Sequence, residues 1–394
     1  MRERKINENM KMQDVGPNGQ SRIVFLDYLR VIACFMVLLA HCCEPFYFSE
    51  DGGCLLGNSG DAFWLAVFVS ACVACVPLFV MASSYLLFPV TRSAGDFLKH
   101  RFLRILLPFF VWSCIYCAFS GGGWRELFFN FPMCGAHMWF VPMLAGLYLV
   151  MPLLSPWAER VTAKETRWWI ALWLVTTSFP FVRKIAAMAV GGVGGGSEPF
   201  LWGECLWNEF GGFHYVSGFM GYVLVGFYIR KFTPQLSWKR TLQISLPLWV
   251  SGWLFNCAVF LCRIPSASGW PVKGPLSLAL DLELGWRTCT TGVAMTAIAA
   301  FLVIRKFTAD GWFYRRVIKP LASASYGTYL VHMLVLPAVL GWFRPHCCTP
   351  VAMVLGGISS FVLSSAISMI LQRIPKIGRI LSPGHQRLKF GLTA

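Results

Sequence analysis

Long runs of hydrophobic residues alternate with short polar segments along almost the whole chain. Most runs have about 20 residues, the length with which an α-helix crosses the hydrocarbon core of a membrane. The pattern predicts an all-α, polytopic integral membrane helix bundle. We expect ten transmembrane helices, at residues 24–43, 62–88, 105–120, 138–155, 168–182, 215–229, 242–262, 288–304, 321–343 and 351–371.

Basic residues are distributed very unevenly between the two sets of polar segments. One set holds 26 Lys and Arg, the other holds 7, and Arg30 lies inside the first span. The positive-inside rule assigns the richer set to the cytoplasm, so both termini are expected there. We predict a cytoplasmic N-terminal tail at 1–22, a membrane domain at 23–371 and a basic cytoplasmic C-terminal tail at 372–394.

The composition supports a membrane protein and excludes several other classes. Hydrophobic residues make up 56% of the chain and charged residues 13%, about half of the charged share in a soluble domain. The net charge of +16 is explained by orientation and by contact with anionic lipid, so we expect no nucleic-acid partner. The 15 cysteines are scattered without zinc-ligand spacing, and we predict no metal site. Whether any outer cysteines pair stays open.

Three ionisable residues lie on one face of the first predicted helix. Asp27 and Arg30 are one turn apart, and His41 follows Arg30 by eleven positions, close to three turns or ~16 Å. Asp27 and Arg30 could form only an interfacial ion pair, with His41 as a packing residue. Because charge inside a bilayer is costly, the three together favour a functional site.

Two arginines precede the third predicted span. Arg101 and Arg104 are one turn apart and can present two guanidinium groups to a polyphosphate such as that of coenzyme A. From spacing alone, an ordinary cluster of cytoplasmic basic residues is the stronger interpretation. Two further histidines, His137 and His332, lie in or beside spans, where a packing role is the usual one. His332 is the stronger candidate of the two, because it lies mid-span.

The chain resembles the acyltransferase family 3 membrane proteins from about residue 25 to residue 371. The resemblance depends most on Arg30 and His41, with ten residues between them, and on the pair Arg101 and Arg104. The segment that ends near Tyr85 and the segments 137–154 and 325–332 are also similar to those of the family.

The resemblance implies an O-acyltransferase of surface polysaccharides or glycolipids in the bacterial cytoplasmic (inner) membrane. Acyl-CoA, with acetyl-CoA the first choice, would be a co-substrate, and no cofactor would be bound permanently. Arg101 and Arg104 would bind the donor phosphates. His41 would be the general base or carry the acyl group, and Arg30 would stabilise the oxyanion or anchor the pantetheine, oriented by Asp27.

Three residues are candidates for supporting roles: His332, His137 and Tyr85. Some members of the family carry a soluble hydrolase-like domain, which this sequence does not contain, so we expect transfer to be completed in the membrane domain. The alternative is a transporter or exporter of a glycan or small solute. Against it, no inverted repeat is visible and the basic pair lies at one mouth of the bundle.

Overall fold

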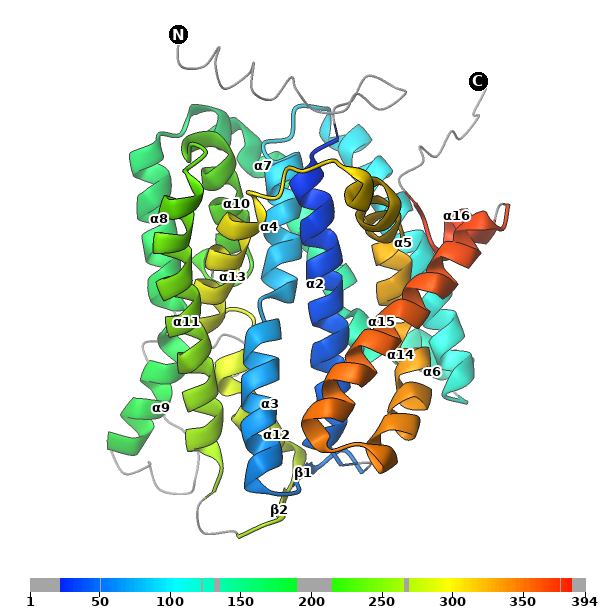
Figure 1. Cartoon of the computed structure of the whole chain (residues 1–394). Helices are drawn as coiled ribbons and strands as arrows, with labels where there is room; N and C mark the ends of the chain where they lie inside the picture. The colour runs from blue at the N-terminus through cyan, green and yellow to red at the C-terminus, as the bar shows by residue number, and fades with distance from the viewer. Residues whose placement is uncertain are drawn as a thin grey trace.

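The computed structural model is an upright bundle of α-helices with one small sheet near one end (Figure 1). It describes residues 22–49, 51–121, 123–130, 135–189, 215–265, 269–375 and 377–384. Residues 1–21 of the predicted N-terminal tail, and residues 376 and 385–394 of the predicted C-terminal tail, lie outside these ranges.

Six long helices form most of the bundle, namely α2 (Val24–Cys43), α5 (Ala94–Phe119), α7 (Phe140–Arg160), α11 (Trp238–Arg263), α14 (Lys319–His346) and α15 (Thr349–Arg373). Nine shorter helices lie among the described residues, namely α3 (Ser59–Cys72), α4 (Cys75–Leu87), α6 (Trp124–Asn130), α8 (Ala163–Thr176), α9 (Phe179–Ala189), α10 (Met220–Phe232), α12 (Leu276–Leu282), α13 (Thr291–Ile304) and α16 (Ile377–Leu381). The short turns are η1 (Glu44–Phe46), η2 (Ala136–Trp139), η4 (Glu283–Trp286) and the π-helical η5 (Tyr314–Ile318).

Each of the ten expected ranges contains a helix, but the structure does not establish ten spans. Among the described residues, seven helices are long and apolar enough to cross a membrane, and an eighth span is obtained if the bent pair Leu276–Trp286 and Thr291–Ile304 counts as one. Helices α8 and α10 are shorter, with 14 and 13 residues. At 1.5 Å per residue each rises only about 20 Å. The count of ten and the orientation of the termini therefore stay predictions.

The start of α5 differs from the sequence-based prediction. The helix begins at Ala94 and not at residue 105, because Ser93 caps it by accepting a hydrogen bond from the Asp96 backbone N–H. A serine cap followed by an acidic residue starts a helix even where the first turns are polar. Arg101 and Arg104 consequently lie within the helix, and their side chains are held by a regular backbone.

Helix α2 lies in the middle of the bundle, packed against α3, α4, α14 and α15. Glycines let α15 come close: a Cβ at Gly357 would lie 2.7 Å from Leu39 Cδ1, and one at Gly356 would lie 2.8 Å from Cys42 Sγ. Small residues at such crossings are typical of helix packing in membranes. A side chain there would force Leu39 or Cys42 to shift on α2, the helix that carries Arg30 and His41.

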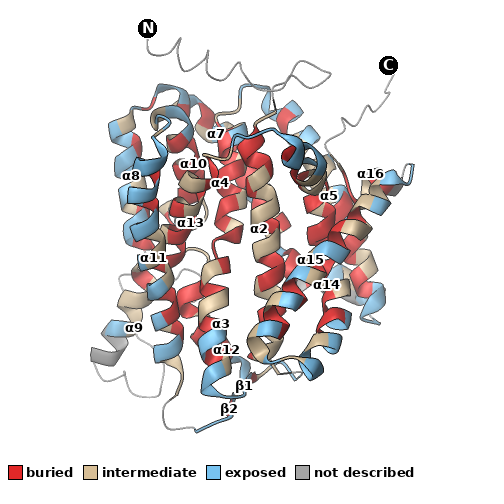
Figure 2. Cartoon of the chain, viewed as in Figure 1, coloured by how far each residue is buried: buried red, intermediate tan, exposed pale blue. Residues whose placement is uncertain are grey.

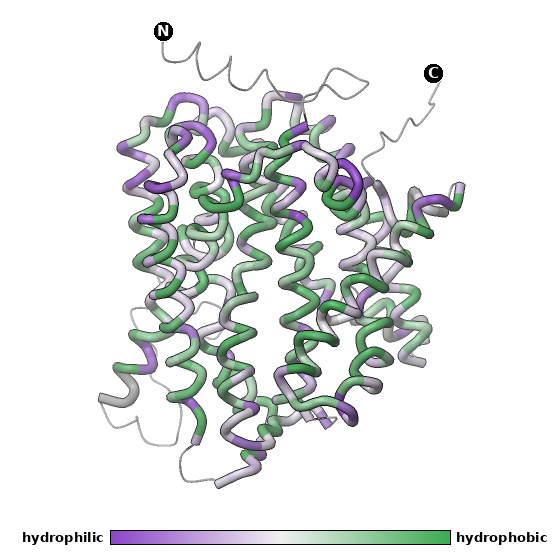
Figure 3. The backbone as a smooth tube through the Cα atoms, in the orientation of Figure 1, coloured by the Kyte–Doolittle hydropathy of each residue, from purple (hydrophilic) through white to green (hydrophobic). Residues whose placement is uncertain are grey.

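The outward faces of the helices are largely apolar. Figure 2 shows the buried residues concentrated inside the bundle, and Figure 3 shows hydrophobic residues continuing along the helices. Large hydrophobic side chains such as Leu153, Leu246 and Val362 are exposed. So much exposed apolar surface is expected for helices whose solvent is lipid.

The small sheet joins two distant parts of the chain at the end of the bundle where α2 finishes. Strand β1 (Cys54–Leu56) pairs antiparallel with β2 (Val272–Gly274). This pairing ties the segment after α2 to the segment before α12 and η4. We call this end the His41 end of the bundle, and the opposite end, where α2 starts, the Arg30 end.

Candidate active site

Three imidazole rings from three distant segments meet at the His41 end. His41 comes from α2, His137 from η2 and His332 from the middle of α14. The ring centroid of His332 lies 5.2 Å from that of His41 and 5.0 Å from that of His137, and the rings of His41 and His137 are 6.4 Å apart. The structure thus brings His41, the main catalytic candidate from the sequence, together with His137 and His332, which are two of the three supporting candidates.

Each of two histidines has a defined protonation pattern. His41 Nδ1 lies 2.8 Å from Glu44 Oε1, and His332 Nδ1 lies 2.5 Å from the backbone carbonyl of Tyr329. A carbonyl, or an ionised carboxylate, can only accept, so the Nδ1–H donates in both cases. In a neutral ring this leaves Nε2 unprotonated and able to take a proton.

The imidazoles of His137 and His332 are buried, and each has a ring nitrogen without a hydrogen-bond partner among the described residues. His332 is fully buried and His137 is 7% exposed. Within the described part of the chain, Nε2 of each has no hydrogen-bond partner. Buried polar atoms without partners are costly, so two of them beside a third imidazole indicate a place that receives a polar group. The side chain of His41 is 20% exposed and is the accessible member of the cluster.

Tyrosines fix the cluster in place. Tyr329 donates from its hydroxyl to the backbone carbonyl of His137 at 2.6 Å, and Tyr116 donates to that of Leu330 at 2.7 Å. The Tyr116 ring also lies 4.9 Å from the His137 ring, edge to face. These contacts tie α5, η2 and α14 together around the imidazoles, so their geometry is set by packing.

Two carboxylates lie beside His41 that the sequence analysis did not select. Glu44 is the nearer, and Glu283 is close enough to interact electrostatically with both His41 and Glu44. Tyr47 donates to Glu283 Oε1 at 2.6 Å, and burial together with the nearby charge of Glu283 raises the pKa of the Tyr47 hydroxyl well above its ordinary value. Tyr47 therefore keeps its proton. The spacing of three residues between His41 and Glu44 was the signal available in the sequence.

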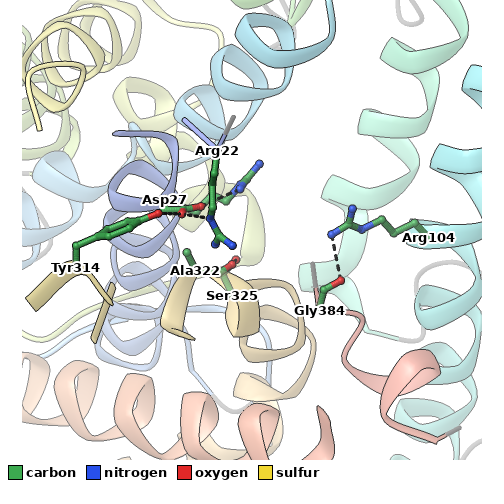
Figure 4. Close-up of polar contacts among 8 residues, drawn as sticks. Arg22, Asp27, Arg104, Tyr314, Ala322, Ser325 and Gly384 are labelled. Carbon is green, nitrogen blue, oxygen red and sulfur yellow. Dashed lines mark hydrogen bonds and ion pairs between the residues drawn. The ribbon is translucent and has the colours of Figure 1, made fainter. Parts of the chain in front are cut away.

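The Arg30 end of α2 holds Asp27 and Arg30, the other two ionisable residues predicted to share a face with His41. Asp27 is fully buried and receives hydrogen bonds from Arg22, from the Tyr314 hydroxyl at 2.7 Å and from Arg30 at 3.2 Å (Figure 4). A buried carboxylate with three donors is well compensated. Asp27 thereby anchors Arg30 and joins α2 to η5.

The arginine pair of α5 lies near the same end. Arg104 interacts electrostatically with Arg101 and with Arg30 on α2. Its guanidinium donates to the backbone carbonyl of Gly384 at 3.2 Å, so the segment after α16 approaches it (Figure 4). The guanidinium of Arg101 lies 6.0 Å from the Phe97 ring centroid. The structure therefore brings three of the predicted basic residues into one region of positive charge.

Tyr85, the remaining supporting candidate, does not join the histidines. Its ring packs against Phe25 at 5.0 Å, and the Arg305 guanidinium lies 6.0 Å from its centroid. Phe25 belongs to the first turn of α2, so Tyr85 lies toward the Arg30 end.

In the part of the chain that the structure describes, no group of three or more His, Cys, Asp or Glu side chains is arranged to hold a metal ion. The arrangement that does exist is an imidazole base with a carboxylate partner at one end of α2, and a basic region at the other. His41 follows Arg30 by eleven positions of uninterrupted helix, a rise of about 16 Å. This combination suits the transfer of a group from a long anionic donor.

Comparison with known proteins identifies the family. A family model described as an acyltransferase domain matches residues 23–371, which include all three histidines and the arginines of α2 and α5. No curated protein and no solved structure matches the chain. The match covers far more than half of the sequence and confirms the resemblance drawn from the motifs. The chain therefore belongs to the acyltransferase 3 family of membrane proteins.

Proposed function

We propose that this protein is a membrane O-acyltransferase with acyl-CoA as donor, acetyl-CoA in the simplest case. The acceptor is a hydroxyl of a polysaccharide or glycolipid intermediate, and the setting is the bacterial cytoplasmic membrane with the Arg30 end toward the cytoplasm. Membership of an acyltransferase family supports the reaction class. The excess of basic residues at that side supports the orientation.

The observation that carries the proposal is His41, held through Nδ1 by Glu44 and next to two buried imidazoles. In the proposed step, His41 Nε2 takes the proton of the acceptor hydroxyl while the hydroxyl oxygen attacks the thioester carbonyl. The tetrahedral intermediate then breaks its C–S bond, and the leaving thiolate recovers the proton from the imidazolium. Glu44 stabilises the imidazolium between the two steps.

At the other end, Arg30 serves the donor and not the reacting carbonyl. Its Nη1 is directed to Asp27, which precedes it in α2, whereas His41 lies three turns in the opposite direction. An extended pantetheine arm is suited to a separation of about 16 Å between phosphate-binding arginines and a base. Arg101 and Arg104 complete the phosphate site from α5.

The test is acyl transfer by the purified full-length protein in nanodiscs, with labelled acetyl-CoA and a membrane glycolipid extract as acceptor. Wild type should release CoA and label a glycolipid, and His41→Ala should do neither while keeping the wild-type elution volume and melting temperature. His346→Ala is the matched control, because that exposed imidazole contacts only its own helix among the described residues. Full turnover by His41→Ala would refute the proposal, and solute flux without labelling would favour the transporter.

A further inference from the structure

A basic pocket opens at the Arg30 end, outside the site described above. It has a volume of about 480 Å³ and is lined by Arg22, Arg315, Lys319, Pro320 and Ser323. Small-molecule sites usually have volumes of about 300–1,000 Å³. Three of the five lining residues are cations and none is acidic, so the pocket is suited to an anion.

One wall of the pocket is a single face of a helix. Arg315, Lys319 and Ser323 follow one another at intervals of four residues along η5 and the start of α14, which places them one above the other. Arg22 forms the facing side from the segment before α2. The cations are therefore gathered by the packing of α14 against α2.

The positive charge of the pocket is only partly neutralised. Arg22 uses Nε to bind Asp27, and in the described part of the chain its buried Nη2 has no acceptor. Arg315 has the exposed Asp310 as ion-pair partner at 3.6 Å. No carboxylate of the described residues pairs with Lys319. A buried guanidinium nitrogen without an acceptor is costly, and an oxyanion would satisfy it.

The pocket adjoins the donor site through Asp27. This carboxylate holds Arg22 with one oxygen and Arg30 with the other. In Figure 4 the Arg22 guanidinium lies beside Ala322 and Ser325 of α14, and the Arg104 guanidinium lies at Gly384. Arg30 interacts electrostatically with both arginines. A ligand that crosses this region can contact both sets of cations. Coenzyme A carries two separate anionic groups, a diphosphate and a ribose 3′-phosphate.

We propose that the pocket lined by Arg22, Arg315 and Lys319 binds a phosphomonoester dianion. Resting on the proposed function, this group is the ribose 3′-phosphate of the acyl-CoA donor, while Arg30, Arg101 and Arg104 hold the diphosphate. The pocket then determines which thioesters are used: a donor with the 3′-phosphate is preferred to one without it.

The experiment compares acetyl-CoA with acetyl-3′-dephospho-CoA as donors for the full-length protein in nanodiscs of neutral lipid. Wild type should have a KM about tenfold lower for acetyl-CoA, because hydrogen bonds to charged groups at a partly exposed site have about this effect. In Arg315→Gln combined with Lys319→Gln, the KM for acetyl-CoA should rise about tenfold and that for the dephospho donor should not change. Arg316→Gln is the matched control, since this exposed neighbour does not line the pocket.

Other outcomes would overturn the assignment. A wild type that does not discriminate between the donors refutes it, and so does a double variant in which both KM values rise equally. If the double substitution matters only in nanodiscs with anionic lipid, the phosphate belongs to a lipid headgroup.

A binding measurement separates this proposal from the proposed function. Adenosine 3′,5′-bisphosphate should bind wild type more tightly than adenosine 5′-monophosphate, and the double variant should lose the difference. If this result is obtained without any acyl transfer, the phosphate site stands and the proposed function fails.

Discussion

Replacing Glu44 by glutamine removes the negative charge beside the proposed base and changes little else. Glu44 Oε1 accepts from His41 Nδ1 at 2.8 Å, and a glutamine oxygen can accept the same hydrogen bond. The imidazole keeps its orientation and its free Nε2 in Glu44→Gln. What is lost is the counter-charge that stabilises the imidazolium formed when the acceptor hydroxyl gives up its proton.

The magnitude follows from burial. A hydrogen bond to a charged group is worth about 1.5–3 kcal/mol when well shielded. The side chains here are 20% exposed for His41 and 37% exposed for Glu44, so solvent screening reduces this contribution to about 1.4 kcal/mol. This corresponds to a loss of about tenfold in kcat for Glu44→Gln. Glu44→Ala also removes the acceptor that orients the ring, and we expect it to lower kcat about 10²-fold.

The assay is release of CoA under saturating acetyl-CoA and glycolipid, with kcat and KM determined separately. The exposed Glu159→Gln at the other end of the bundle changes the charge equally and should behave as wild type. A wild-type kcat in both Glu44 variants would refute the reasoning. It would also be refuted if adding Glu44→Gln to His41→Ala reduced the residual rate by the same tenfold, because partners in one step do not act independently.

Three further predictions concern the rest of the site. Arg101→Gln with Arg104→Gln should raise the KM for acetyl-CoA at least tenfold with little change in kcat. An unchanged KM would mean that the two arginines only set the orientation of the protein in the membrane. Gly357→Ala should lower stability by about 1–3 kcal/mol and reduce kcat, because the new Cβ would meet a side chain of α2, whereas Gly341→Ala, with open space around it, should have neither effect. Asp27→Asn should lower the melting temperature and raise the KM together, since two cations lose their buried partner, and a change in only one of these would contradict the linkage.

Local sequence patterns predicted most of the helices but not all of their lengths. The apolar runs located α2 well, because nearly every residue of that run is hydrophobic. They missed the start of α5, where a serine cap and polar first turns precede the apolar run. Hydrophobicity reports burial or lipid contact, whereas helix starts are set by capping groups. Helix α8 shows the same limit: it begins at Ala163 and not at residue 168, because Thr162 caps it by accepting from the Glu165 backbone N–H.

The assembly of the site could not be predicted from the sequence. His41, His137 and His332 were each visible as polar residues in or beside apolar runs, but nothing in one sequence states that three distant segments meet. Glu44 lies just beyond the predicted span that ends at residue 43, so intramembrane charge did not single it out, although the helical spacing from His41 continues through it. Arg315 and Lys319 belong to the basic set that the sequence assigns to the cytoplasm, and nothing more distinguishes them there, since a pocket depends on what faces them across the fold.

The helix α2 explains why the two ends of the site must be considered together. It carries Arg30 and His41 on one unbroken helical segment, so their separation cannot change unless the helix breaks. At the Arg30 end Asp27 joins the helix to η5 by accepting from Tyr314, and at the His41 end Glu44 orients the His41 ring. Between these ends, the glycines of α15 let the two helices pack in direct contact. A donor bound at the Arg30 end would therefore present its thioester at a distance set by the protein, and the length of the donor arm would decide whether the thioester reaches the base.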